Sequence, residues 1–475
     1  MQRRECVIGI DLAQVGHALC FDERALARQA LQNARDDLRQ QGLQLIAGGC
    51  TRLMEHRGAF AAAIDGVKGG KWFSLIDKVY QPVTLQAAWR KVAANAGASG
   101  VDRQSVEQFA ARAEQYLGER EAALKAGNYE WPEASPPMAV LRVEIPKGAG
   151  KMRPLGIPAV KDRIVQTALF VIEPIFEGEF LDMSCGFRPG RGCKDALRDV
   201  DRLLKAGYTH VVDADLASYF DTIPHTRLMA RVGERVSDGR ILALIEAFLH
   251  QDIVKGAQRW TPTGGTPQSA VISPLLANVY LHKLDCLMRE YGYQMVRYAD
   301  DFVVLCQTAD EARAGLATVQ AWVTANGLTL NPDKTHVGDC REPGQGFDFL
   351  GYHFEAGQRW VRRKSLNAIR ERIRAKTRRT CAESLACIIA ELNPMRQGWY
   401  NSFQHAHPWT FSGMDGFIRR RLRALRRKQQ KRTGAGHTLA DHKRWPNAYF
   451  AELGLFTMTE AHALASQSQI GRAHV

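Results

Sequence analysis

The sequence lacks long hydrophobic runs, paired cysteines and internal repeats, and each absence excludes a class of protein. No apolar run approaches the roughly 20 residues that a membrane helix needs. The apolar start of the chain is interrupted at Asp11, so we expect neither a signal peptide nor a membrane partner. The ten cysteines form no Cys-x-x-Cys pair and no Cys/His cluster, which argues against a disulfide framework and a zinc finger. These absences predict a globular protein of the cytosol.

Acidic residues are scarce between Val361 and Trp445, where only five Asp and Glu accompany 21 Lys and Arg. The rest of the chain is nearly neutral, with 43 basic and 45 acidic residues, so this segment carries the whole formal excess of +14. Such a basic block is typical of a polyanion partner, although a solvated helix face without a partner would have the same composition. Nucleic acid is therefore the leading candidate partner.

The spacing of apolar residues predicts a mixture of helices and strands. Residues 26–38 and 74–131 follow helical spacing, but nothing in residues 1–65 carries chemistry. Residues 140–145 alternate as in a strand, and a glycine turn at 148–150 separates them from Lys151 and Arg153. We therefore predict a β-hairpin with cations at its tip.

Four aspartates occupy two segments with the pattern of strands. The segment 210–216 predicts a short strand with Asp213 and Asp215 on one face. Residues 294–305 form two apolar arms around Asp300 and Asp301, a composition typical of a tight hairpin. Phosphoryl transfer to a 3′ hydroxyl uses two divalent cations held by hard oxygen ligands, which carboxylates supply. By itself, however, an Asp-Asp turn is more often a solvent-facing hairpin end.

Ordered motifs around these acids favour the catalytic interpretation. Tyr298-Ala299-Asp300-Asp301 is the most distinctive of them. The others are residues 145–147, 153–158, 162–166, 186–191, 213–221, 265–278, 327–335 and 349–352. In this order the series resembles the fingers and palm motifs of reverse transcriptases encoded by bacterial group II introns, and the resemblance covers residues 71–458. Residues 392–400 and 417–423 resemble the maturase domain of the same proteins.

The resemblance implies an α+β right-hand polymerase fold, in which fingers and palm with antiparallel sheet precede an α-helical thumb and maturase domain. It predicts an N-terminal extension of unknown role (1–65) and a helical N-terminal reverse transcriptase segment (66–135). Fingers and palm (136–355) and a basic helical thumb/maturase domain (356–458) follow. Residues 459–475 form a tail that can be partly foreign sequence.

The resemblance also implies roles for individual residues. Asp215, Asp300 and Asp301 are the catalytic acids and hold two Mg²⁺ ions, for which Mn²⁺ is a conceivable substitute, whereas Asp213 is interpreted as structural. Phe220 lies where its ring would collide with a ribose 2′ hydroxyl and so favour deoxynucleotides, although core packing is the alternative. The predicted nucleotide-binding residues are Lys147, Lys151, Arg153, Phe220, Gln268 and Lys334. A solvated hairpin tip is the alternative for the first three.

One departure from the family pattern lies beside the nucleotide pocket. Ser269 and Ala270 stand where the family usually has two glycines, which adds side chains close to the nucleotide or template. Altered activity or fidelity would follow. Because the catalytic acids are intact, we expect an active polymerase.

The maturase resemblance implies that the basic block binds structured intron RNA by shape, backbone and stacking. The predicted RNA contacts are Arg188, Arg191, Arg396, Arg419, Arg420, Arg421, Arg423, Arg426, Arg427 and Lys428. Aromatic residues interleaved with them, such as Trp399 and Tyr400, are more often core residues. Charge and spacing alone do not show whether any one of these residues contacts RNA or packs in the core.

Together these resemblances imply an RNA-directed DNA polymerase, a nucleotidyltransferase that adds dNTPs to a DNA or RNA primer on an RNA template. Its maturase domain would assist intron splicing and retrohoming into target DNA in the bacterial cytosol, at the nucleoid. We expect no terminal endonuclease segment, so priming would use an existing 3′ end. The alternatives are a free-standing group II-like reverse transcriptase in host DNA repair or defence, and an RNA-binding splicing factor with lapsed polymerase. Intact acids argue against the last.

Overall fold

The computed structural model describes residues 70–127, 137–148, 151–267, 270–381 and 383–472, which fall into two compact units. The first unit comprises the described residues up to Glu179 together with Ile223–Val279. The second comprises Phe180–Thr222 and the described residues from Tyr280 onward. The predicted extension at residues 1–65 lies outside the described residues. The predicted domain boundaries stay predictions.

Helices open the first unit, as the spacing predicted: α2 (Ile76–Val79), α3 (Pro82–Ala94), α4 (Val106–Ala110) and α5 (Ala113–Ala126). Proline starts α3, a position that needs no backbone donor, and the helix buries Leu85, Ala88 and Val92. A capping box between Ser105 and Gln108 begins α4.

The sheet of the first unit is built on the predicted hairpin, β1 (Val140–Gly148) and β2 (Lys151–Ile157), which pair antiparallel. The strands β4 (Ile253–Lys255) and β5 (Gln258–Trp260) complete the order β2-β1-β4-β5. Five short helical segments accompany it, namely α6 (Val160–Ala168), the 3-10 turn η1 (Leu169–Ile172), α7 (Glu173–Glu177), α10 (His225–Gly233) and α11 (Gly239–Leu249). The buried carboxylate of Asp162 in α6 accepts from the backbone N–H of Met138 at 2.8 Å, just before β1.

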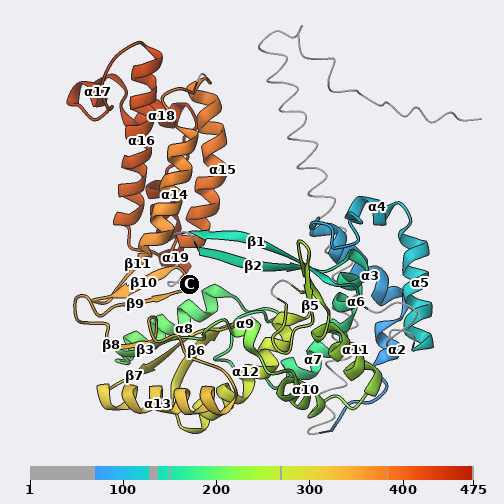
Figure 1. Ribbon diagram of the computed structural model, residues 1–475. Coiled ribbons are helices and arrows are strands. Elements are labelled where there is room, and N and C mark those ends of the chain that lie inside the picture. Colours follow the sequence, from blue (N-terminus) through green and yellow to red (C-terminus); the bar gives the residue numbers. More distant parts are fainter. Residues whose placement is uncertain (1–69, 128–136, 149–150, 268–269, 382, 473–475) are drawn as a thin grey trace, which may run out of the picture. The chain divides into compact units, whose positions relative to one another are not determined.

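The second unit contains a four-stranded antiparallel sheet in the order β6-β7-β3-β8. Its strands are β3 (His210–Asp215), β6 (Gln294–Tyr298), β7 (Asp301–Cys306) and β8 (His336–Asp339). The helices α8 (Cys193–Lys205) and α13 (Ala309–Ala325) cover opposite faces of this sheet (Figure 1). Two further helices belong to the same region, α9 (Tyr219–Thr222) and the end of α12 (Ser273–Glu290).

A small sheet and a group of helices complete the second unit. The strands β9 (Phe347–Phe349), β10 (Tyr352–Glu355) and β11 (Gln358–Val361) pair in the order β11-β10-β9. The helices are α14 (Arg363–Lys376), α15 (Leu385–Phe403), α16 (Trp409–Gln429), α17 (Leu439–Arg444), α18 (Asn447–Glu452) and α19 (Met458–Arg472). The long helices α14, α15 and α16 run side by side (Figure 1), and one hydrophobic core joins α8, the large sheet and these helices.

This architecture confirms the predicted α+β class, with mainly antiparallel sheets, in which β1 and β4 pair parallel, followed by a helical C-terminal region. Within the described residues, no helix is both long and apolar enough to cross a membrane. The hydrophobic core of the second unit matters most for function, because it holds the strands that carry the aspartates.

Candidate active site

The sheet register gathers the predicted acids at one end of the second unit's large sheet. Asp215, the last residue of β3, pairs directly with Asp301, the first residue of β7. Asp213 lies two residues earlier on the same face of β3. Asp300 stands in the two-residue turn between β6 and β7. Residues about 85 positions apart in sequence therefore meet because β3 pairs antiparallel with β7 of the β6-β7 hairpin.

The turn that carries Asp300 has a constrained backbone. Ala299 adopts a φ of 60°, in the left-handed region that a residue with a Cβ atom rarely occupies. Gly186 packs against it so closely that a Cβ atom at that position would lie 2.3 Å from the Ala299 nitrogen. This contact gives a physical reason for a glycine in the motif 186–191.

The acids share a partly buried position, and their negative charges repel one another. Burial raises the pKa of Asp301 to about 7, and the charges of Asp213, Asp300 and Asp215 act in the same direction. Burial likewise raises the pKa of Asp213 to about 6. A cluster of carboxylates whose ionisation is resisted in this way would be stabilised by a bound cation.

Two residues that the sequence left unassigned add to this charge cluster. The negative charge of Asp348 raises the pKa of Asp213, whereas a hydrogen bond from the Asp348 backbone lowers it. Arg362, which binds Asp348 at 2.7 Å, opposes the rise in the pKa of Asp301. Asp348 immediately precedes the motif at residues 349–352. This position was the one sequence feature that could have marked Asp348 as a residue of the site.

Lys334 lies at the acids, as part of the loop before β8. Its Nζ donates to the Oδ2 atom of Asp215 at 2.7 Å, and the side-chain amide of Asn331 donates to the same oxygen at 3.4 Å. The backbone N–H of Asn331 also donates to the Asp215 carbonyl at 2.8 Å. The segment 327–335 thus fixes the end of β3 and supplies a cation to its terminal carboxylate.

The donor chemistry of the acids suits a divalent metal ion, since hard carboxylate oxygens are the ligands that Mg²⁺ prefers. In their present rotamers, however, no three His, Cys, Asp or Glu side chains among the described residues are gathered closely enough to hold an ion. The carboxylate of Asp215 instead faces Lys334 and Asn331. The strand register brings the candidate ligands to one end of the sheet, and their side chains would have to turn to hold a cation.

The predicted nucleotide-binding residues are divided between the two units. Phe220 belongs to α9 in the second unit and is only partly buried, whereas its neighbour Tyr219 is a core residue. Arg153 lies exposed on β2 in the first unit. The side chains of Lys147 and Lys151 and the whole of Gln268 lie outside the described residues. Their meeting with a nucleotide stays a prediction.

Of the departure at Ser269 and Ala270, Ser269 lies outside the described residues, whereas Ala270 and the backbone that follows it are described. Ala270 is buried, and the N–H of Val271 donates to the Oε1 atom of Gln166 at 2.8 Å. Gln166, which ends the motif at residues 162–166, is itself fully buried. This motif therefore anchors the start of the segment that leads into α12.

The two arginines of the loop 180–192 form hydrogen bonds to other residues of the same loop. Arg188 donates to the carbonyl oxygens of Leu181 at 2.6 Å and Ser184 at 2.8 Å, and its guanidinium lies over the ring of Phe180. Arg191 donates to the carbonyl of Asp182 at 3.0 Å and forms an ion pair with its carboxylate. These contacts give both residues a role in holding the loop, and the RNA contacts predicted for them stay predictions.

Two arginines of the basic block that were predicted to contact RNA have buried side chains, so that prediction is corrected for them. Arg396 is 1% exposed and donates to Asp415 at 2.8 Å. Arg423 is 2% exposed and donates to the Trp445 carbonyl at 2.9 Å. Both guanidinium groups lie in the core, where a phosphate cannot reach them, because their helices turn these positions inward.

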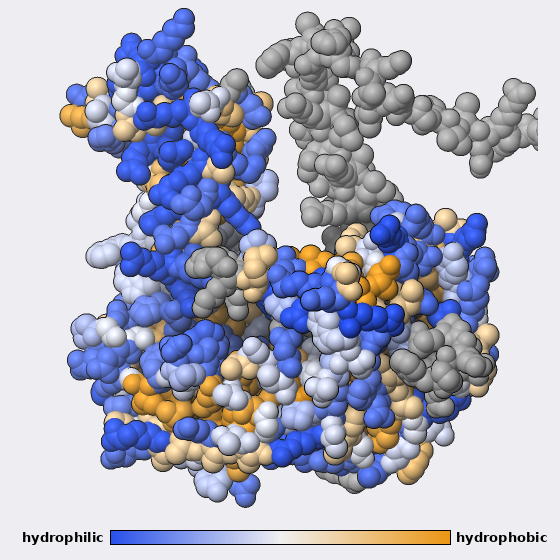
Figure 2. Space-filling model, viewed as in Figure 1, coloured by the Kyte–Doolittle hydropathy of each residue, from blue (hydrophilic) through white to orange (hydrophobic). Residues whose placement is uncertain are grey.

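Other predicted contacts remain at the surface of the helices, where Figure 2 shows mainly hydrophilic residues on the visible side of α14, α15 and α16. Arg420 and Lys428 are exposed, and Arg419 and Arg426 are partly so. Arg421 and Arg427 are partly buried and donate to carbonyl oxygens of Thr377 and Thr433. Lys428 also lines a cavity of about 390 Å³ together with Arg379, Lys431 and Arg432, which the sequence did not single out.

The comparisons with known proteins agree with this arrangement. Residues 145–354 match the family described as "Reverse transcriptase (RNA-dependent DNA polymerase)". Residues 366–445 match the "Group II intron, maturase-specific domain". The class that fold and site define is therefore a reverse transcriptase, and reverse transcriptase domains generally use divalent metal ions.

The relatives narrow this class. Protein YkfC of Escherichia coli (strain K12) is 34% identical over 321 residues, which are 58% of this chain and 82% of YkfC. Group II intron-encoded protein LtrA of Lactococcus lactis subsp. cremoris is 35% identical over 209 residues, covering 43% of this chain and 33% of LtrA. An uncharacterized 91 kDa protein in a cob intron of Schizosaccharomyces pombe is 40% identical over 256 residues, covering 41% and 32%. The chain belongs to the group II intron-type reverse transcriptases, in which a reverse transcriptase domain is followed by a maturase-specific domain. It spans about a third of the length of the two intron proteins.

Proposed function

We propose that this reverse transcriptase adds dNTPs to a DNA or RNA primer on an RNA template, with two Mg²⁺ ions held by Asp215, Asp300 and Asp301. The observation that carries the proposal is the register that sets Asp215 opposite Asp301, with Asp300 in the adjoining turn. When bound, such ions activate the attacking 3′ oxygen and neutralise the leaving phosphate, and Mn²⁺ has the same ligand preference.

The other residues of the site then have distinct tasks. Lys334, which donates a hydrogen bond to Asp215, serves as the proton donor to the pyrophosphate leaving group. Phe220 excludes a ribose 2′ hydroxyl. Lys147, Lys151, Arg153 and Gln268 grip the incoming nucleotide, since a triphosphate calls for several cations and hydrogen-bond donors.

A primer-extension assay on an RNA template tests the acids. We expect Asp300→Ala to abolish dNTP addition in Mg²⁺, because it removes a metal ligand. The matched control is Asp310→Ala, which removes a surface carboxylate of the same unit whose side chain is 90% exposed. Extension by Asp300→Ala at the rate of the wild type would refute the assigned site.

We propose further that the basic helices bind structured RNA, including an intron RNA whose splicing and retrohoming into target DNA the protein assists. The match to the maturase-specific domain and the concentration of 21 Lys and Arg between Val361 and Trp445 support this partner. The bacterial cytosol, at the nucleoid, is the place we propose for it. A free-standing enzyme for repair or defence would keep the same site, and intron RNA sequences flanking the gene would decide between the two.

A further inference from the structure

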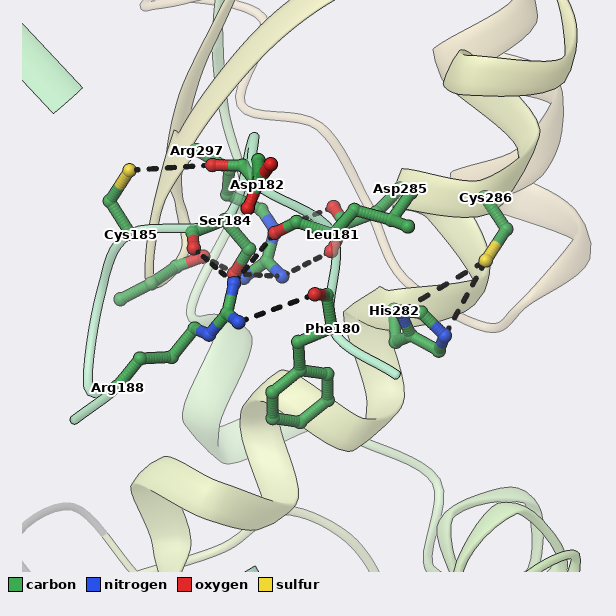
Figure 3. A network of polar contacts seen from close by, with 11 residues as sticks. Phe180, Leu181, Asp182, Ser184, Cys185, Arg188, His282, Asp285, Cys286 and Arg297 are labelled. Carbon is green, nitrogen blue, oxygen red and sulfur yellow. Dashed lines mark hydrogen bonds and ion pairs between the residues drawn. The ribbon is translucent and has the colours of Figure 1, made fainter. Parts of the chain in front are cut away.

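A network of polar contacts (Figure 3) reaches the turn that carries Asp300 through the carbonyl oxygen of Ala299. Its centre is Arg297, the penultimate residue of β6, whose side chain is fully buried. Asp285 of α12, also fully buried, accepts from Arg297 through both carboxylate oxygens, with 2.7 Å between Nε and Oδ1. This two-point contact fixes the plane of the guanidinium.

The guanidinium makes two further contacts that the ion pair itself does not require. Its Nη1 atom donates to the carbonyl oxygen of Ala299 at 2.9 Å, and its Nη2 atom donates to the Oγ atom of Ser184 at 2.7 Å. Ala299 is the residue with the left-handed backbone, and it directly precedes Asp300. Arg297 therefore joins the turn to two separate elements, α12 and the loop 180–192.

The same loop also reaches the strand through its backbone. The N–H of Arg297 donates to the Met183 carbonyl at 2.8 Å, and the N–H of Cys185 donates to the Arg297 carbonyl at 2.8 Å. Arg188 ties the loop to itself, as Figure 3 shows, and Gly186 meets Ala299. The unfavourable φ of Ala299 is thus held from two sides, by a hydrogen bond to its carbonyl and by backbone packed against its nitrogen.

We propose that Arg297 is a positioning residue for metal binding: anchored on Asp285 and Ser184, it holds the Ala299 carbonyl and so aims Asp300 and Asp301 toward the cations. This inference rests on the proposed function of the three acids. The competing explanation is a buried ion pair that stabilises the fold and leaves the turn unaffected.

Arg297→Lys separates these explanations. A lysine keeps a positive charge next to Asp285 but has a single nitrogen, which cannot grip both carboxylate oxygens and reach Ala299 and Ser184 in the same fork geometry. The matched control is Arg396→Lys, the same change in a second fully buried Arg-Asp pair of this unit, which lies in α15 and pairs with Asp415 of α16. Both variants should lose stability.

Three measurements on the full-length protein give the result. Electron paramagnetic resonance measures Mn²⁺ binding in the absence of nucleic acid. Amide hydrogen exchange in residues 296–304 measures how well the backbone is ordered, and the Mg²⁺ dependence of primer extension measures activity. For Arg297→Lys we expect an apparent Kd for Mn²⁺ raised by about tenfold or more, the usual effect of losing a group that orients a metal ligand. Faster exchange in residues 296–304 should accompany it, and the control should show neither change.

Wild-type Mn²⁺ affinity and unchanged exchange in a folded Arg297→Lys protein would overturn the inference. If that variant does not fold, Ser184→Ala takes its place, because it removes only the hydroxyl that binds Nη2 of Arg297. We expect Ser184→Ala to raise the Kd for Mn²⁺ by less than Arg297→Lys would. An unchanged Kd would count against the inference. A wild-type protein that neither binds Mn²⁺ nor extends a primer would instead refute the proposed function. Hydrogen exchange would still report whether Arg297 orders the turn.

Discussion

Replacing Gly186 with alanine tests how accurately the turn before Asp300 has to be placed. A Cβ atom at this position would lie 2.3 Å from the Ala299 nitrogen and 2.9 Å from the Tyr298 carbonyl carbon. Ordinary contact begins at about 3.4 Å, so the loop and the turn have to separate by about 1 Å. Both partners are backbone atoms, so no side chain can rotate away to make room.

A shift of this size in a catalytic group can lower the rate by roughly 100-fold. We therefore expect Gly186→Ala to reduce single-nucleotide addition by about two orders of magnitude, and to lower the free energy of unfolding by about 1–3 kcal/mol, as for other overpacked sites. The assay is single-turnover dNTP incorporation on an RNA template, with thermal unfolding measured in parallel. The rate of incorporation should fall further than stability alone accounts for at a temperature where the variant is folded.

The control is Gly192→Ala in the same loop, where an added Cβ atom meets no atom within 4 Å and the backbone is extended. It should retain activity. Wild-type incorporation by Gly186→Ala would refute the reasoning, because the close approach of Gly186 to Ala299 would then not constrain the turn.

Two further predictions concern the basic helices. Arg396→Ala leaves Asp415 buried without its cation, so we expect the free energy of unfolding to fall by about 3–5 kcal/mol. Arg419→Ala, on the partly exposed side of α16, should change it by about 0.5 kcal/mol or less. Equal unfolding midpoints of the two variants in denaturant titrations would contradict this. Changing Arg419, Arg420 and Lys428 together to Gln should lower the slope of log affinity against log salt for structured RNA by roughly 0.7–0.9 per lost phosphate contact, measured by filter binding over a salt series. An unchanged slope would remove these three residues from the RNA surface.

Much of the secondary structure could be predicted from the sequence, because local rules decide it. Alternation and a glycine turn predicted the hairpin β1-β2, and apolar arms around an acidic turn predicted β6-β7. Helical spacing predicted α3 and α16. The ordered motifs predicted the family, which the matches at residues 145–354 and 366–445 confirm.

Roles of individual charged residues were harder to predict, because charge in a sequence does not reveal which way a side chain points. Arg396 and Arg423 look like their basic neighbours, yet both lie in the core. Arg188 and Arg191 make contacts within their own loop, and the RNA binding predicted for them stays a prediction. Arg297 has no special sequence signal apart from its place just before the motif 298–301.

Residue identity, order and local periodicity were enough to establish the family, the chemical types of the candidate ligands and the concentration of positive charge near the C-terminus. The tertiary structure alone established that Asp215 faces Asp301, that Lys334 reaches the same carboxylate, and that Arg297 binds the turn from behind. Such contacts join residues separated by up to about 120 positions, and they depend on strand register and on which helix face packs inward.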